Sequence, residues 1–245
     1  MSKTVAIVQA RMGSGRLPGK VLEKIQDRTM LEHVVRRLQM TGVLDDVIVA
    51  TSRKPTDDAI EALCRAEGLS FYRGHEDDVL SRYLEAAEEF GATEIVRVCA
   101  DSPFVDPQVS RGLIAEFVQN LSQFDYGCNH VPLTYPLGLN TEIFTIEALR
   151  RTHENATEFY HRSHVTLYMV ERPEEFRTLK QAAPGEFGHH RWTVDTPEDL
   201  AFARAVFEAV GDSSFTWRDV LHVLENNPAL TSINQHVSQK DVRLG

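Results

Sequence analysis

A loop rich in glycine and fixed positive charge runs from Gln9 to Lys20. It follows the apolar run 4–8, which we expect to form a buried strand. The loop contains three glycines, and its cations include Arg11 and Arg16 as well as Lys20. Glycine lets backbone N–H groups approach a ligand closely, and the cations supply charge for polyanionic oxygens. This chemistry suits a triphosphate.

An ordinary exposed connection could carry the same residues. The loop matches neither G-x-G-x-x-G nor G-x-x-x-x-G-K-[ST], which excludes a Rossmann dinucleotide fingerprint and a P-loop. Three cations within ten residues, directly after a buried strand, nevertheless favour a phosphate site over a surface loop.

Two aspartates, Asp101 and Asp195, each come directly after an apolar run. A carboxylate at the carboxyl end of a parallel strand faces the ligand crevice, and two of them can hold one Mg²⁺ with open positions for water and phosphate. Either aspartate could instead cap the following turn or helix, where Pro103 and Pro197 stand. Together with the cationic loop, the pair favours a metal site.

Other chemistries have less support. His161 and His164 lie three apart on an expected helix, but a third zinc ligand at convincing spacing is missing. Buried or surface histidines are the simpler interpretation. No Ser-His-Asp order or G-x-S-x-G elbow is present, which leaves acyl-transfer hydrolysis without support.

Composition limits the class of protein. The 245 residues are 42% hydrophobic, which predicts a packed globular chain, and the net charge of -10 argues against general binding of nucleic acid or anionic membranes. Cys64, Cys99 and Cys128 are odd in number and lack CxxC spacing, as expected in the reducing cytoplasm. We expect neither a signal peptide nor membrane insertion.

The first half of the chain alternates between strand and helix patterns. The expected strands are 5–10, 47–51, 70–72 and 94–100, and the expected helices are 30–41, 56–67 and 77–90. Thr56 is the expected N-cap of the second helix. Such repeated units predict an α/β fold with a mostly parallel sheet, helices on both faces, and ligands beyond the carboxyl ends of the strands.

The second half is less regular. Its patterns predict helices at 107–119, 146–153 and 158–170, a turn and strand within 135–144, and strands at 176–179 and 191–194. Thr196 is expected to cap a further helix, with Pro197 at the first position and Asp199 at the third. Because no linker divides the halves, we expect one domain over 1–245 with a substrate or dimerisation sub-region at about 125–190.

At the level of whole motifs, the chain resembles the cytidylyltransferases that activate acidic sugars. These are the CMP-sialic acid and CMP-Kdo synthetases, and especially the spore-coat polysaccharide and pseudaminic acid branch. The resemblance rests on four blocks in the family's order, which together span residues 4 to about 205: Gln9–Leu22, Tyr72–Tyr83, Val98–Pro107 and Arg191–Leu200. The first block is highly specific by itself. The other three are moderately specific one by one, and they become strong evidence because they occur in the family's order.

The resemblance implies a GT-A-like, Rossmann-like α/β nucleotidyltransferase that is Mg²⁺-dependent and homodimeric. Such an enzyme joins CTP, or another nucleoside triphosphate, to a sugar or sugar acid for surface polysaccharide synthesis and releases pyrophosphate. By position, the residues implied to bind the nucleotide are Ala10, Arg11, Met12, Gly13, Ser14, Arg16, Lys20, Asp78 and Arg82. The implied metal ligands are Asp101 and Asp195, the catalytic residues Lys20, Arg16 and Asp101, and the substrate residues Asn140 and Glu142.

Four positions depart from the family pattern. They are Gly15, where Thr is usual, Ala100, where Gly is usual, Ser102, where Cys or Glu is usual, and Asn140, which replaces the acid of a Gly-x-Asp-x-Glu pattern. Two alternatives stay open. One, which the fold alone cannot exclude, is a glycosyltransferase that uses a nucleotide-sugar. The other, which the changes at Gly15, Ala100 and Asn140 motivate, is a nucleotide-binding homologue without turnover.

Overall fold

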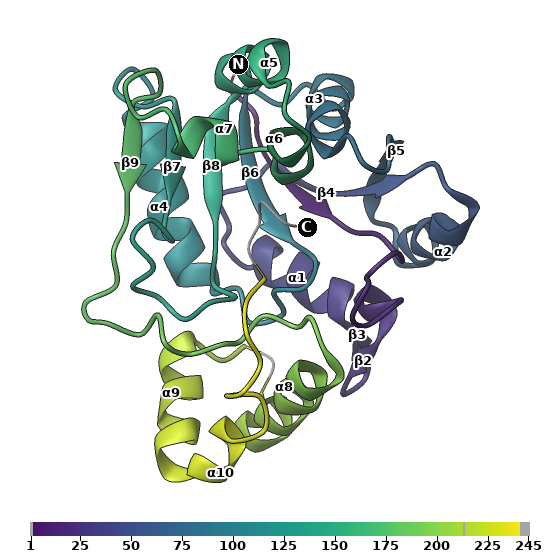
Figure 1. Ribbon diagram of the computed structural model, residues 1–245, viewed down its shortest axis with the longest axis vertical. Coiled ribbons are helices and arrows are strands. Elements are labelled where there is room, and N and C mark those ends of the chain that lie inside the picture. Colours follow the sequence, from purple (N-terminus) through teal and green to yellow (C-terminus); the bar gives the residue numbers. More distant parts are fainter. Residues whose placement is uncertain (1, 213, 241–245) are drawn as a thin grey trace.

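The computed structural model describes residues 2–212 and 214–240, and it shows an α/β molecule whose chain ends in a smaller helical lobe (Figure 1). The described strands form one seven-stranded sheet and a short ribbon of β2 (Lys24–Ile25) and β3 (Arg28–Thr29). In spatial order, the strands of the large sheet are β5 (Ser70–Gly74), β4 (Asp46–Ser52), β1 (Thr4–Gln9), β6 (Glu94–Cys99), β8 (Glu142–Thr145), β7 (Tyr126–Cys128) and β9 (Thr178–Lys180).

The large sheet is mostly parallel, as the sequence predicts. β1 lies between β4 and β6 and runs parallel to both, with Val8 beside Val49 on one side and Val98 on the other. β4 is also parallel to β5, and β7 to β9, whereas β8 is antiparallel to both β6 and β7. The carboxyl ends of β1, β4 and β6 therefore meet at one edge of the sheet.

Helices follow most of the strands. In the described residues, the α-helices are α1 (Met30–Gln39), α2 (Asp58–Glu67), α3 (Val79–Glu89), α4 (Pro107–Gln119), α5 (Ile146–Asn155), α6 (Phe159–His164), α7 (Leu167–Val170), α8 (Pro197–Val210), α9 (Trp217–Asn226) and α10 (Pro228–Thr231). Two 3-10 turns are η1 (Lys20–Leu22) and η2 (Pro55–Asp57). None of these helices is long and apolar enough to cross a membrane.

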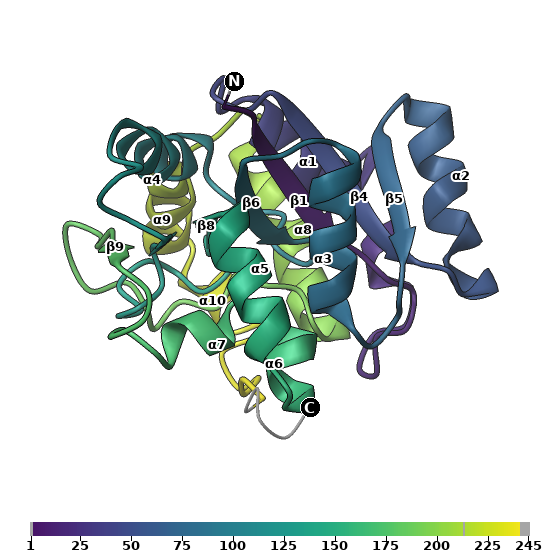
Figure 2. The same cartoon turned by 90° about the horizontal axis from the view of Figure 1, so that it is seen from above.

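Alternation along the strands divides the core between the two faces of the sheet. Val5 and Ile7 of β1 pack in a cluster with α3 and α5, whereas Ala6 and Val8 pack with α1 and α4 on the opposite face (Figure 2). Successive side chains of a strand point to opposite faces. A continuous apolar run is therefore what a strand covered on both faces requires.

The C-terminal lobe has an apolar cluster of its own, which also takes in residues close to the sheet. Phe104, which follows β6, has its ring centroid between 5.1 and 6.0 Å from those of Trp192, Phe202, Phe207 and Phe215. These rings attach α8 and α9 to the segment that follows β6, so the lobe is positioned next to the carboxyl end of that strand.

One predicted helix cap is confirmed and another is wrong. The Thr196 side chain accepts from Asp199 N, and the Asp199 carboxylate accepts from Thr196 N, which forms the capping box of α8. Thr56, however, does not cap α2, because η2 comes first and Asp57 takes the N-cap position. Asp57 makes no side-chain cap either, since its carboxylate is buried against the loop that follows β1.

Two other expected elements differ from the structure. The helix expected over 158–170 is divided into α6 and α7, because Val165 has a positive φ of 58°. Residues 191–194 do not form a strand beyond an isolated bridge between Arg191 and Leu137. Both Trp192 N and Thr193 N donate to the Leu137 carbonyl, and two N–H groups that share one acceptor cannot continue a ladder.

Candidate active site

Lys20 lies between the two aspartates of the predicted metal site. Its Nζ donates to Asp101 Oδ2 at 2.9 Å, to Asp195 Oδ1 at 2.7 Å and to the Val194 carbonyl at 2.8 Å. Asp101 follows β6, Asp195 precedes α8, and Lys20 opens η1. Three oxygen atoms from two distant segments thus converge on one charged nitrogen.

Asp195 has further cationic partners. Arg16 and Arg191 each place a guanidinium nitrogen 2.9 Å from Asp195 Oδ2. Arg191 also donates to the buried Asp199 carboxylate, which links the site to the capping box of α8. Burial raises the pKa of Asp195, but the charges of Lys20 and Arg16 lower it by more, and its pKa lies below the ordinary 3.8.

The ammonium of Lys20 is stabilised in the same way. Burial lowers the pKa of Lys20, but Asp101 and Asp195 raise it by more, so its pKa lies above the ordinary 10.5. Lys20 and Asp195 are therefore both charged at neutral pH. The site holds its charges in place before a ligand binds, which is the preorganisation that charge-stabilising catalysis uses.

The loop after β1 is folded around the peptide of Met12. The Met12 carbonyl accepts from Ser14 N and from Gly19 N, each at 2.9 Å. Gly19 has a φ of 73°, a conformation that favours glycine, and Lys20 follows it. The fold of the loop therefore determines where Lys20 begins its turn.

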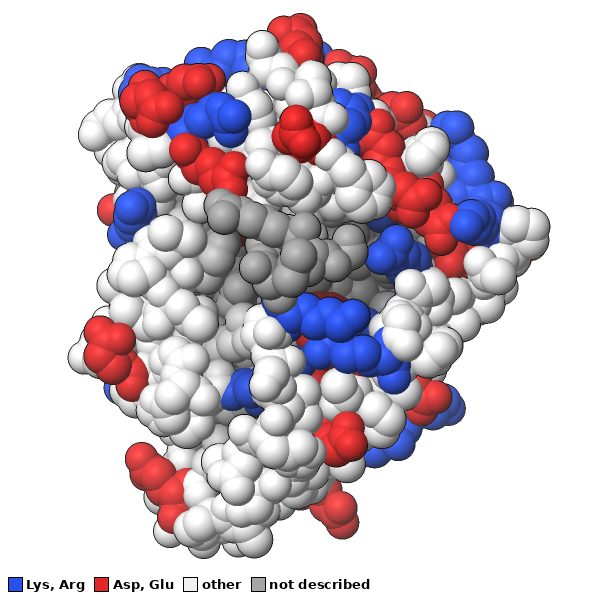
Figure 3. Space-filling model, in the orientation of Figure 1, with Lys and Arg blue, Asp and Glu red and all other residues white. Residues whose placement is uncertain are grey.

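Two adjoining pockets cover this site. The larger has a volume of about 710 Å³ and is lined on one side by loop residues from Arg11 to Lys20 and by Asp101 and Asp195, and on another by Asn140 and Glu142. Figure 3 shows Lys and Arg side chains gathered at a hollow in this face of the molecule, with acidic side chains behind them. Cationic side chains thus gather around Asp101 and Asp195, although the chain as a whole carries a net negative charge.

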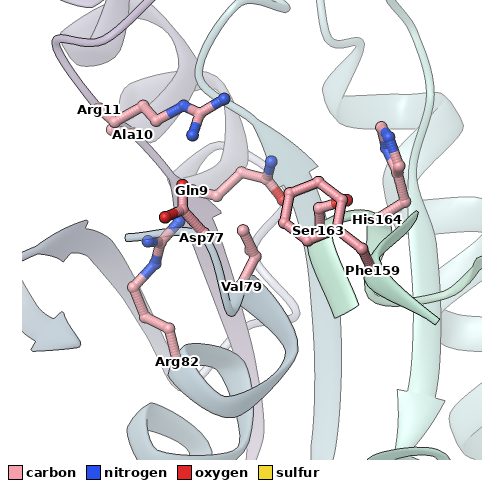
Figure 4. A pocket seen from close by; sticks show the side chains of 9 residues that line it. All are labelled: Gln9, Ala10, Arg11, Asp77, Val79, Arg82, Phe159, Ser163 and His164. Atoms are coloured by element: carbon pink, nitrogen blue, oxygen red, sulfur yellow. The ribbon is translucent and has the colours of Figure 1, made fainter. Parts of the chain in front are cut away.

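The smaller pocket has a volume of about 280 Å³ and shares Gln9, Arg11 and His164 with the larger one. In Figure 4, Arg11 and Arg82 extend toward one side of it, and the Phe159 ring lies on the opposite side, beside Ser163 and His164. The Phe159 side chain is 62% exposed. Because they share lining residues, we treat the two pockets as one groove with a strongly charged part and a smaller, mixed part.

The predicted substrate residues have different settings. Asn140 lies on the wall of the larger pocket, whereas Glu142 is buried in its floor and forms an ion pair with Arg97. Tyr126 donates to the other carboxylate oxygen of Glu142 at 2.6 Å. Burial raises the pKa of Glu142, but Arg97 and His130 outweigh that effect and bring the pKa to about 2.

Most of the predicted nucleotide residues line the groove. Those on its walls are Ala10, Arg11, Gly13, Ser14, Arg16, Lys20 and Arg82. Met12 and Asp78 are not among the described residues that line the two pockets. Asp78 instead accepts from Ser81 N at the start of α3 and from two nitrogens of Arg162, so it connects α3 to α6.

The histidine pair of the second half does not face a common ligand. His161 is buried and lies 2.8 Å from the Glu171 carboxylate, whereas His164 lines both pockets. His161 is thus a core histidine with a polar partner, the simpler of the two interpretations of the sequence.

Three residues of the site were not singled out from the sequence. Arg191 lies in a recognised block without an assigned role, and Asp57 directly follows Thr56, the expected N-cap, where an acidic residue is ordinary. Arg97 carried a usable signal, because a charge inside an apolar strand run is expensive unless it is paired. The structure shows its partner, Glu142, directly across the antiparallel pair β6–β8.

Asp101 and Asp195 offer the oxygen ligands that Mg²⁺ prefers, but Lys20 Nζ occupies the point between them, so an ion would have to replace the ammonium there or bind beside it. Mg²⁺ prefers oxygen ligands, and two carboxylates and one carbonyl meet at this point. The described residues contain no group of three or more His, Cys, Asp or Glu that could hold a metal ion. Two carboxylates would leave the remaining positions of the ion to water and phosphate oxygens, which is how Mg²⁺ is usually bound beside nucleotides.

Comparison with known proteins supplies the family of this chain. The cytidylyltransferase family model matches residues 5–229. The spore coat polysaccharide biosynthesis protein SpsF of Bacillus subtilis is 33% identical over 237 residues, which cover 93% of this chain and 96% of that protein. The chain belongs to the cytidylyltransferase family.

Solved structures agree with this assignment. A cytidylyltransferase from Leptospira borgpetersenii superposes with a TM-score of 0.91 at 29% identity, over 98% of this chain and all (100%) of the other. A CMP:2-keto-3-deoxy-manno-octonic acid synthetase solved with CTP has a TM-score of 0.63 at 20% identity, over 84% of this chain and 99% of its own, and shares the fold.

Proposed function

We propose that this enzyme transfers CMP from CTP to a sugar acid with release of pyrophosphate, as a Mg²⁺-dependent cytoplasmic homodimer that serves surface polysaccharide synthesis. The observation that carries the proposal is the convergence of Lys20 with Asp101 and Asp195 inside a cationic groove. The match to the cytidylyltransferase family supports the choice of CTP. The relative SpsF, whose name refers to spore coat polysaccharide biosynthesis, supports the choice of pathway.

In the proposed reaction, a hydroxyl oxygen of the sugar forms a bond to the α-phosphorus of CTP. The bond from that phosphorus to the bridging oxygen of the β-phosphate breaks, pyrophosphate leaves, and the proton of the attacking hydroxyl passes to water. Such transfers depend mainly on positioning and on neutralising charge. The chain offers both, because Arg16 and Lys20 are held in place by direct ion pairs with Asp101 and Asp195 in the same wall of the groove.

Each part of the groove has a proposed role. Arg11, Ser14 and Arg16 bind the triphosphate, and Lys20 and Arg16 stabilise charge on the departing pyrophosphate. Asp101 and Asp195 would hold Mg²⁺, which when bound supplies positive charge to phosphate oxygens.

The remaining walls suit the nucleoside and the sugar. The nucleoside occupies the smaller pocket, against Arg82 and the Phe159 ring. The sugar occupies the Asn140 side of the larger pocket, above the buried pair of Arg97 and Glu142.

A pyrophosphate-release screen tests the proposal. Four nucleoside triphosphates are combined with a panel of sugar acids and sugar phosphates, with Mg²⁺ and with a chelator. We expect release with CTP and a sugar acid in the presence of Mg²⁺, and its loss in Asp101→Asn. Asp27→Asn, at a side chain that is 67% exposed, is the matched control and should keep wild-type turnover.

Two outcomes would contradict the proposal: release that prefers another nucleotide with a sugar phosphate, or CTP binding without any release. Release of a nucleoside diphosphate from a nucleotide-sugar would indicate a glycosyltransferase instead. Light scattering after size-exclusion chromatography tests the homodimer separately.

A further inference from the structure

Asp57 has a buried carboxylate that the proposed reaction does not use. Asp57 is 2% exposed and is the last residue of η2, just before α2. One oxygen, Oδ1, accepts from Met12 N at 2.8 Å. The other, Oδ2, accepts from Ser52 N at 3.1 Å, Ser52 Oγ at 2.6 Å and Thr51 Oγ1 at 3.1 Å. The carboxylate therefore joins the carboxyl end of β4 to the loop after β1.

The Met12 N–H that donates to Asp57 lies within the loop from Gln9 to Lys20, which we call the triphosphate loop. The Met12 carbonyl accepts from Ser14 N and Gly19 N, so both limbs of the loop close on the same residue whose N–H Asp57 binds. Gly19 leads directly into Lys20. A displacement of Met12 would thus be passed to the start of η1 and to the cation that lies between the two aspartates.

A carboxylate is the side chain that this position requires. Four N–H or O–H donors point at two oxygens, and an ionised carboxylate accepts without donating. An amide would place an N–H group against one of these donors, and burial would leave that mismatch uncompensated. The negative charge itself opposes binding of a polyanion nearby, so the value of Asp57 to the loop lies in its acceptor geometry.

We propose that Asp57 is the positioning residue of the triphosphate loop. By fixing the Met12 peptide on the end of β4, it holds the loop in the conformation that receives the phosphates before the nucleotide arrives. Preorganisation of this kind lowers the ordering cost of binding. The inference rests on the proposed function, because it takes the loop's ligand to be CTP.

The variants Asp57→Asn and Ser52→Ala test the inference. Asp57→Asn should raise the KM for CTP by ~10-fold or more, while kcat changes less and the KM for the sugar stays the same. Ser52→Ala removes one donor to the same carboxylate but leaves the Met12 bond in place. It should lower the melting temperature without raising the KM for CTP.

A measurement on the wild type does not depend on the folding of a variant. Without nucleotide, the Met12 amide should exchange its hydrogen at least ~10-fold more slowly than the amide of Gly15 in the same loop. Equal exchange of the two amides, or a folded Asp57→Asn enzyme with an unchanged KM for CTP, overturns the inference. A wild type that binds no CTP contradicts the proposed function instead.

Discussion

Lys20 and Asp195 are 175 positions apart in the sequence, yet Lys20 Nζ donates to Asp195 Oδ1 at 2.7 Å. We predict that Lys20→Ala lowers kcat by about 10²–10³-fold, because the departing pyrophosphate loses a preorganised charge. Lys20→Arg should not restore activity, since a planar guanidinium cannot donate to three oxygens that converge on one point. Pyrophosphate release at saturating CTP measures the effect, and Lys24→Ala, at an exposed position, is the control.

Arg191 holds both Asp195 and Asp199, and we expect Arg191→Gln to disturb the site through these carboxylates. The expected result is about a 10-fold or greater loss of kcat, because Asp195 loses one of its orienting donors. Gln239 accepts from another nitrogen of Arg191, and Gln239→Ala should leave kcat close to that of the wild type. Equal losses in the two variants would show that Arg191 acts by anchoring the chain end.

Gly138 and Gly15 both line the larger pocket but differ in the space available for a side chain. Gly138 has a φ of 115°, and a Cβ there would lie 2.7 Å from Thr193 N, whereas nothing lies within 4 Å of a Cβ on Gly15. Gly138→Ala should lower the free energy of unfolding by about 1–3 kcal/mol. Gly15→Ala should change it by less than about 0.5 kcal/mol. Urea unfolding measures both, and a stable Gly138→Ala would contradict the expected strain.

Arg97 and Glu142 form a largely buried ion pair across β6 and β8, with Glu142 buried and the Arg97 side chain 13% exposed. Glu142→Gln should lower the free energy of unfolding at neutral pH by about 3–5 kcal/mol, because Arg97 is left buried without its counter-charge. Glu88→Gln is the matched surface control, since Glu88 is 49% exposed in its pair with Arg150, and it should have little effect.

The same pair predicts a dependence on pH. The pKa of Glu142 is about 2 in the folded protein, against an ordinary 4.5, so the unfolded chain takes up the proton first as the pH falls. The stabilisation is complete above about pH 4.5 and is lost as the pH falls toward 2. The difference in unfolding free energy between wild type and Glu142→Gln should therefore shrink across this range. A difference that stays constant would show that Glu142 is not ionised in the native protein.

Much of the framework could be predicted from local patterns. The apolar runs gave β1, β4 and β6 to within a residue or so, because strands covered on both faces need continuous apolar sequence. The rule that parallel strands present their carboxyl ends at one edge then placed Asp101 near the loop that carries Lys20. The capping box of α8 could be predicted because Thr196 is followed at fixed spacings by Pro197 and Asp199.

Other features depend on contacts that no local pattern contains. The segment at Arg191 has the residue types of a strand, but its N–H groups turn to the carbonyl of Leu137, more than 50 positions earlier. Val165 has a φ of 58° and a ψ of -65°, and Thr166 N donates to the His164 carbonyl across it, so it is the centre of a γ-turn that its β-branched type disfavours. Asp57 stands at the N-cap position of α2, as its residue type favours, but its carboxylate makes no cap because it accepts from Met12 N and Ser52 N instead.

The Val194 peptide faces the site with both of its polar groups: its N–H donates to the Asp101 carbonyl at 2.8 Å and its C=O accepts from Lys20. α8 starts three residues later. Any swing of the C-terminal lobe away from the sheet would therefore break the contacts that hold Lys20 beside Asp101 and Asp195. We accordingly expect a truncation that removes the lobe to abolish the proposed turnover even if the sheet still folds.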